Sequence, residues 1–126
     1  MANVTASQGT PCRLWLELEP AAGSLVPSGF SYHIEWLGPD GEQEFLLKTS
    51  DEGRQVQEGN RIHLEVDIPR DAPIGHYDPT RFEMRYSSRN HHNVREESVD
   101  EVPLPSIEVS GASHPEVPWP KVKSSG

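Results

Sequence analysis

Short runs in which apolar and polar residues alternate with a period of two restrict the fold of this chain more than any other feature. The clearest run covers residues 61–68, RIHLEVDI, where Ile62, Leu64, Val66 and Ile68 alternate with polar or charged residues. In an extended strand this period places every apolar side chain on one face and every polar one on the other. We therefore expect a half-buried β-strand here.

The same alternation recurs in residues 12–18, 30–36, 82–86 and 106–110. A polar loop, with a short edge strand expected at residues 54–57, precedes the run at residues 61–68. The 12 prolines and 10 glycines divide the chain into pieces that are too short for long helices. The fold class we expect is therefore all-β, a two-sheet antiparallel sandwich of six to seven strands.

A hairpin is predicted around residues 39–42, Pro-Asp-Gly-Glu, which lie between two apolar runs and are typical of a tight loop. The register that follows pairs Gly38 with Gln43, Trp36 with Phe45, Ile34 with Leu47 and Tyr32 with Thr49. All apolar partners then share one face, as a half-buried sheet requires. Further along the chain, Pro79 has no amide to donate and should interrupt its strand as an edge or bulge residue.

The length of 126 residues suits a single domain with one modest core. We expect an N-terminal arm at residues 1–11, the sandwich at residues 12–110, and a proline-rich tail at residues 111–126. The tail contains Trp119 among three prolines, in PEVPWP, a composition typical of extended chain.

Residues 68–77, IPRDAPIGHY, followed by an alternating strand, resemble the corner between two strands of immunoglobulin-like domains, including bacterial forms without a disulfide. The resemblance extends loosely over residues 12–110. It implies that the Tyr77 hydroxyl bonds back to the turn and that Trp36 is the core tryptophan. An antibody domain would have its second cysteine where this chain has Pro79, so a disulfide-stapled antibody domain is excluded. The resemblance implies a fold and no activity.

Charge and composition narrow the range of partners. Acidic residues outnumber basic ones by 20 to 11, for a formal net charge of -9, so nucleic acid and anionic membranes are not expected partners. No apolar stretch approaches the roughly 20 residues that a membrane-spanning helix needs. Cys12 is the single cysteine, and the first residues lack the basic start and apolar run of a secretion signal. A cytoplasmic setting is the expectation.

The predicted loop at residues 87–105 carries most of the candidate binding residues. They are His91, His92, Glu96, Glu97 and Asp100. A loop this long is either a contact surface or a solvated connection. Adjacent histidines in extended chain point to opposite sides, and no third ligand follows at a standard spacing, so we expect neither a metal site nor a cofactor.

Trp15, Leu37 and Leu46 fall on the outward-facing positions of their strands. Such residues mark either a protein interface or a surface that a loop or the tail of this chain covers. Enzyme motifs such as a Gly-x-Ser-x-Gly elbow or a His-Glu-x-x-His helix are absent from the sequence. We therefore expect a non-catalytic protein-binding or assembly module that uses the long loop, an edge strand or both, with another protein or a second copy as partner. The alternative is a carbohydrate or small-ligand module in which Trp15 or Trp119 stacks on the ligand.

Overall fold

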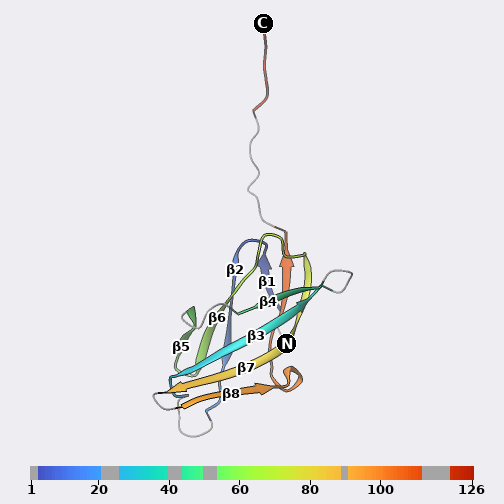
Figure 1. Cartoon of the computed structure of the whole chain (residues 1–126). Coiled ribbons are helices and arrows are strands. Elements are labelled where there is room, and N and C mark those ends of the chain that lie inside the picture. Colours follow the sequence, from blue (N-terminus) through green and yellow to red (C-terminus); the bar gives the residue numbers. More distant parts are fainter. Residues whose placement is uncertain (1–2, 21–25, 40–43, 50–53, 89–90, 112–119) are drawn as a thin grey trace.

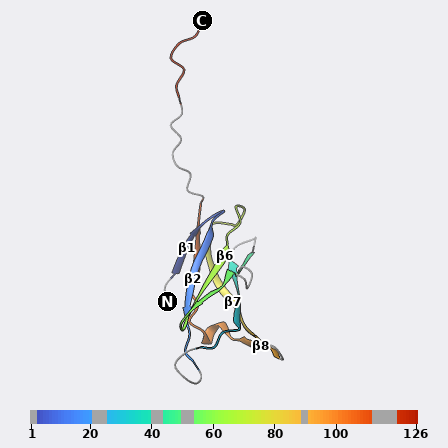
Figure 2. The same ribbon diagram turned by 90° about the vertical axis from the view of Figure 1, so that its left-hand side faces the viewer.

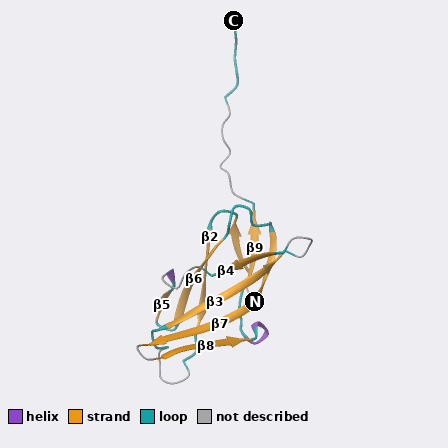
Figure 3. Cartoon of the chain, in the orientation of Figure 1, coloured by secondary structure: helices purple, strands orange, loops and turns teal. Residues whose placement is uncertain are grey.

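The computed structural model describes residues 3–20, 26–39, 44–49, 54–88, 91–111 and 120–126, and strands dominate these segments (Figure 1, Figure 2 and Figure 3). Nine strands lie in the described part of the chain, two more than the upper expectation. They are β1 (Asn3–Ser7), β2 (Pro11–Glu17), β3 (Phe30–Gly38), β4 (Phe45–Lys48), β5 (Val56–Glu58), β6 (Arg61–Asp67), β7 (Gly75–Ser88), β8 (His91–Glu97) and β9 (Ser106–Ser110). A short 3₁₀ helix, η2 (Val99–Glu101), precedes β9.

The strands form two sheets. The larger has the order β1-β9-β7-β3-β4, with β8 paired to β7 beside this path, and the smaller has the order β2-β6-β5. The expectation of an antiparallel fold holds for all the pairs but one, because β1 runs parallel to β9. Residues 3–7, expected as part of an N-terminal arm, thus form a strand of the larger sheet. Their run is too short and too weakly apolar to predict a strand by itself.

Strand β7 organises the larger sheet. It pairs with β3 on one side, while β9 and β8 follow one another along the other side (Figure 1). The register with β3 shifts where Trp36 lies opposite Pro79 and Glu35 opposite Arg81, so β7 has one extra residue there. The predicted interruption at Pro79 is confirmed, because a residue without an amide is accommodated at a bulge.

The core fills the space between the two sheets and is made of the alternating apolar residues. Trp36 is fully buried on β3, and its indole N–H donates to the Pro105 carbonyl at 2.8 Å. Tyr77 is also buried, and its hydroxyl donates to the Pro73 carbonyl, four residues earlier, at 2.6 Å. Cys12 lies in the same core, where burial raises the pKa of its thiol.

The predicted register of the β3–β4 hairpin is wrong by two residues. Gly38 pairs with Phe45 and Trp36 with Leu47, and the Thr49 amide donates to the Ile34 carbonyl at 3.0 Å. The connection between the strands is therefore longer than the predicted four residues. A shift of two residues keeps every side chain on the same face, so the apolar pattern cannot distinguish the two registers.

Residues 120–126 of the predicted tail have no regular secondary structure and are exposed. Trp119 lies outside the described residues. In the part of the chain that the structure describes, no helix has the length and apolar character needed to cross a membrane.

Candidate functional site

The segment expected as a long loop, residues 87–105, instead contains a strand and a short helix. His91–Glu97 forms β8, which pairs with the second half of β7, and η2 follows it. The run HHNVREE has one apolar residue, Val94, whose side chain is 64% exposed. Backbone pairing with β7 builds this strand, and because neither face is apolar, no alternation in the sequence predicts it.

The candidate residues from the sequence do not converge on one site. His91, His92, Glu96 and Glu97 lie along β8, and Asp100 is exposed on η2. Trp15 lies on β2, in the other sheet. Two separate surfaces therefore carry them, one along β8 and one along β2.

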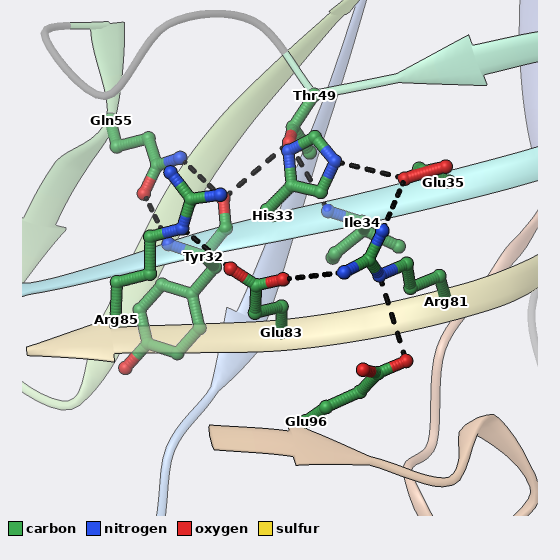
Figure 4. Close-up of polar contacts among 10 residues, drawn as sticks. All are labelled: Tyr32, His33, Ile34, Glu35, Thr49, Gln55, Arg81, Glu83, Arg85 and Glu96. Atoms are coloured by element: carbon green, nitrogen blue, oxygen red, sulfur yellow. Dashed lines mark hydrogen bonds and ion pairs between the residues drawn. The ribbon is translucent and has the colours of Figure 1, made fainter. Parts of the chain in front are cut away.

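The outer face of β3, β7 and β8 carries a network of charged side chains (Figure 4). Glu83 is only 5% exposed because it lies between Arg85, at 2.6 Å, and Arg81, at 3.0 Å. The hydrogen bond from Arg85, with the charges of both arginines, holds the pKa of Glu83 below its usual range. Arg81 also approaches Glu35 at 3.7 Å and Glu96 at 3.6 Å, so the network links all three strands.

Side chains close the part of the β3 edge that β4 does not reach (Figure 4). The Gln55 amide group bonds to both the Tyr32 N–H, at 3.0 Å, and the Tyr32 carbonyl, at 2.7 Å. The Thr49 hydroxyl accepts from the Ile34 amide at 3.2 Å. These groups take the place of a further strand, so this edge offers few free backbone groups to a partner.

Strand β2, in contrast, has an open edge. It pairs only with β6 among the described strands. The Leu18 amide donates to the Asn60 carbonyl at 2.6 Å, so the backbone groups of Leu18 and of the even-numbered residues of β2 point toward β6. Because that direction alternates, the N–H and C=O groups of Arg13, Trp15 and Glu17 point away from β6.

Strand β8 also has an open edge, since β7 is the one described strand that pairs with it. The Ser87 amide donates to the Gly29 carbonyl at 3.0 Å. In this part of β7, the backbone N–H and C=O groups of odd-numbered residues therefore point toward β3, and those of even-numbered residues point toward β8. Met84 lies opposite Arg95 in the register, so the odd-numbered residues of β8 face β7. The backbone groups of His92, Val94 and Glu96 therefore point to the open side.

A groove of about 440 Å³ lies directly beside the open edge of β2. One side is formed by residues 13–18 and the other by residues 102–105, with Val4 and Phe82 completing the lining. Most of the lining is apolar. Pro103 and Pro105 have no N–H groups, so an extended segment in the groove would find its backbone donors on β2.

Trp15 marks the middle of this edge on the outer face of the smaller sheet, and it is 52% exposed. The Arg61 guanidinium lies 4.0 Å from the centre of its ring, and Arg61 also pairs with Glu17 at 3.0 Å. Arg13 pairs with Glu65 at 3.3 Å. The outer side chains at the open edge are thus an arginine, a tryptophan and a glutamate in succession.

A third cluster joins β7 to β9 and was not foreseen, since its members are far apart in sequence. His76 contacts Glu108 through Nδ1 and Asp78 through Nε2, the latter at 2.7 Å, and Ser106 donates to Asp78 at 2.8 Å. Hydrogen bonds to Glu108 and then Asp78 raise the pKa of His76. The Ser106 bond lowers the pKa of Asp78. Among the described residues, no three His, Cys, Asp or Glu side chains are arranged to hold a metal ion.

The chain matches no known protein family, and a search of the curated proteins finds no significant match.

Proposed function

We propose that this chain is an immunoglobulin-like domain. The order β2-β6-β5 corresponds to strands B, E and D of that fold, and β3, β7 and β9 correspond to C, F and G. The buried Trp36 on the C-type strand and the Tyr77 hydroxyl bond at the start of the F-type strand support the same assignment. Strand β8 is then an addition between F and G.

We further propose that the domain is a non-catalytic protein-binding or assembly module that engages its partner through the open edge of β2. The observation that carries this proposal is the position of the edge beside the apolar groove, with the half-exposed Trp15 at its centre. Unpaired backbone groups on an edge strand readily pair with an extended segment of another chain. Apolar surface beside the edge adds affinity that backbone pairing alone lacks.

The edge of β8 is the weaker candidate. Edge strands are commonly protected from pairing by charged side chains, and β8 has Arg95, Glu96 and Glu97 in succession. On β2 the three outer residues at the edge, Arg13, Trp15 and Glu17, include only two charges, and these two are separated by the tryptophan. The less protected edge is therefore that of β2.

Stacking of a sugar on Trp15, the alternative function, has less support. A ring that stacks on a sugar needs a free face, and Arg61 occupies one face of Trp15. The apolar groove beside the ring favours an extended apolar segment over a polyhydroxylated ligand.

The two edges can be separated by placing proline where the amide faces the open side. Trp15→Pro and Val94→Pro each remove one outward N–H and leave the bonds to β6 or β7 in place. We expect proteins captured from the source lysate by the unmodified domain to be lost with Trp15→Pro and kept with Val94→Pro. Circular dichroism would establish that both variants fold. Capture that survives Trp15→Pro and is lost with Val94→Pro would contradict the proposal.

A further inference from the structure

We propose that the occupant of the β2 edge is a second copy of this chain, and that two β2 strands pair antiparallel about a twofold axis between their Trp15 residues. The inference rests on the proposed function, since it names the partner of the same edge. The feature that carries it is the sequence of the edge itself, Arg13-Leu14-Trp15-Leu16-Glu17.

The charges of this segment are complementary to those of its own antiparallel copy. When Trp15 lies opposite Trp15 of the partner subunit, Arg13 lies opposite Glu17 of the partner subunit, and the symmetry repeats this pair. Both side chains are exposed on the outer face of the smaller sheet. Opposite charges directly across a sheet are favourable pairs, and one dimer contains two of them.

The backbone is arranged for this pairing. The outward N–H and C=O groups belong to Arg13, Trp15 and Glu17, the residues that the register brings face to face. Each of these residues can exchange both hydrogen bonds with its counterpart, as in the closely spaced pairs of an antiparallel ladder. Pro11, at the start of β2, has no amide and ends the ladder there.

The charges also exclude the neighbouring registers. Moving to the next register in either direction places Trp15 opposite the partner's Arg13 or the partner's Glu17, which breaks both Arg–Glu pairs. The registers after those place Arg13 opposite the partner's Arg13, or Glu17 opposite the partner's Glu17. Like charges directly opposite one another are destabilising, so the register centred on Trp15 is preferred.

The groove runs beside the edge that would pair. The groove follows residues 13–18, the stretch that would pair, and its far wall is the segment at residues 102–105. The pairing would join the two smaller sheets into one continuous sheet that runs from β5 of one protomer to β5 of the other. Pairing would also cover the edge of β2 that is open in the monomer.

The test uses charge reversal on the full chain and sedimentation equilibrium as the measurement. Arg13→Glu places glutamate opposite the partner's Glu17, and Glu17→Arg places arginine opposite the partner's Arg13. We expect each variant alone to raise the dimer dissociation constant about tenfold or more. The double variant restores both pairs, so we expect its dissociation constant to return to within about threefold of the original.

Mixing the two single variants gives the sharpest result. A chain with glutamate at both positions and a chain with arginine at both positions form two complementary pairs, so the mixture should form a heterodimer although neither variant dimerises well alone. Arg54→Glu, an exposed reversal on the same sheet face, is the matched control and should leave the original dimer unchanged. Double-variant rescue also separates pairing from damage to the fold, because the double variant does not restore the Arg13–Glu65 and Arg61–Glu17 pairs within one chain.

Three outcomes would overturn the inference. They are a chain that stays monomeric at millimolar concentration, a dimer that the single reversals leave unchanged, and a dimer that Val94→Pro abolishes and Trp15→Pro does not. The first leaves the proposed function standing, because capture of a different protein that is lost with Trp15→Pro would still support it. The third contradicts both.

Discussion

The guanidinium group of Arg61 lies 4.0 Å from the centre of the Trp15 ring, so a residue of β6 covers the exposed tryptophan at the centre of the β2 edge. Arg61 also bonds to Glu17, which lies two residues further along that edge. One side chain of the central strand thus positions two of the three outer residues of the edge strand. These contacts hold the side chains of Trp15 and Glu17 in place within the single chain.

Arg61→Ala should release the Trp15 ring. A cation–ring contact at an exposed site contributes about 0.5–1 kcal/mol, and an exposed ion pair about the same or less. We expect the free energy of unfolding to fall by about 1 kcal/mol, and the indole signal of Trp15 to shift in an NMR spectrum. Arg54→Ala, which removes ion pairs without a ring contact, should leave that signal in place. An unmoved indole signal in Arg61→Ala would contradict the contact.

Tyr77→Phe should weaken the corner between β6 and β7. The substitution removes the hydroxyl that donates to the Pro73 carbonyl and leaves the buried ring in place. We expect a loss of about 1–2 kcal/mol in the free energy of unfolding, measured by urea denaturation. Tyr86→Phe, on the same strand and only partly buried, is the comparison and should cost less. Equal losses in the two variants would argue against a special role for the corner.

Glu83→Gln should make the protein less sensitive to acid. The arginine contacts lower the pKa of Glu83, so its carboxylate contributes stability that is fully present above the unfolded pKa, about 4.3, and is lost as pH falls through the folded value. The gap in melting temperature between the original protein and Glu83→Gln should therefore be widest near neutral pH and close as pH falls below about 4. A gap that is constant from pH 7 to pH 3 would show that the charge is not responsible.

The stability that His76 contributes should depend on pH in the opposite direction to that of Glu83. The carboxylate contacts of His76 raise its pKa, so the stability it contributes is fully present below the unfolded pKa, about 6.5, and is lost as pH rises through the folded value. An NMR titration should give His76 a pKa above its ordinary value, and Asp78→Asn should move that value back toward it. His76→Gln should abolish the matching change in stability with pH. A titration of His76 at its ordinary value would contradict the cluster.

The parts of the fold that the sequence predicts are those in which one face is apolar. The strands that became β2, β3, β6, the second half of β7, and β9 all have that pattern, and each lies in a sheet. The hairpin register failed because a shift by two residues preserves the same pattern. Strand β8 was missed because backbone pairing, and not an apolar face, holds it in the larger sheet. Strand β1 was missed because only two apolar residues, Val4 and Ala6, face the core.

In the candidate site, too, the local sequence pattern predicts some features, and others depend on long-range contacts. Trp15 was found because an aromatic residue on the outward parity of a strand is conspicuous, and the structure places it at an open edge. That this edge is open depends on the sheet order, which no local pattern contains. The groove needs residues 13–18 and 102–105 side by side, a long-range contact that the sequence does not indicate.

The central claim is that the open edge of β2 pairs with another strand, and amide hydrogen exchange tests it most directly. Exchange would be measured on the unmodified chain at low and high protein concentration, residue by residue. The account predicts that the amides of Arg13, Trp15 and Glu17 become strongly protected as concentration rises, while that of Val94 on the β8 edge exchanges as before. A dimer in which those three amides remain as unprotected as in the monomer would contradict the account.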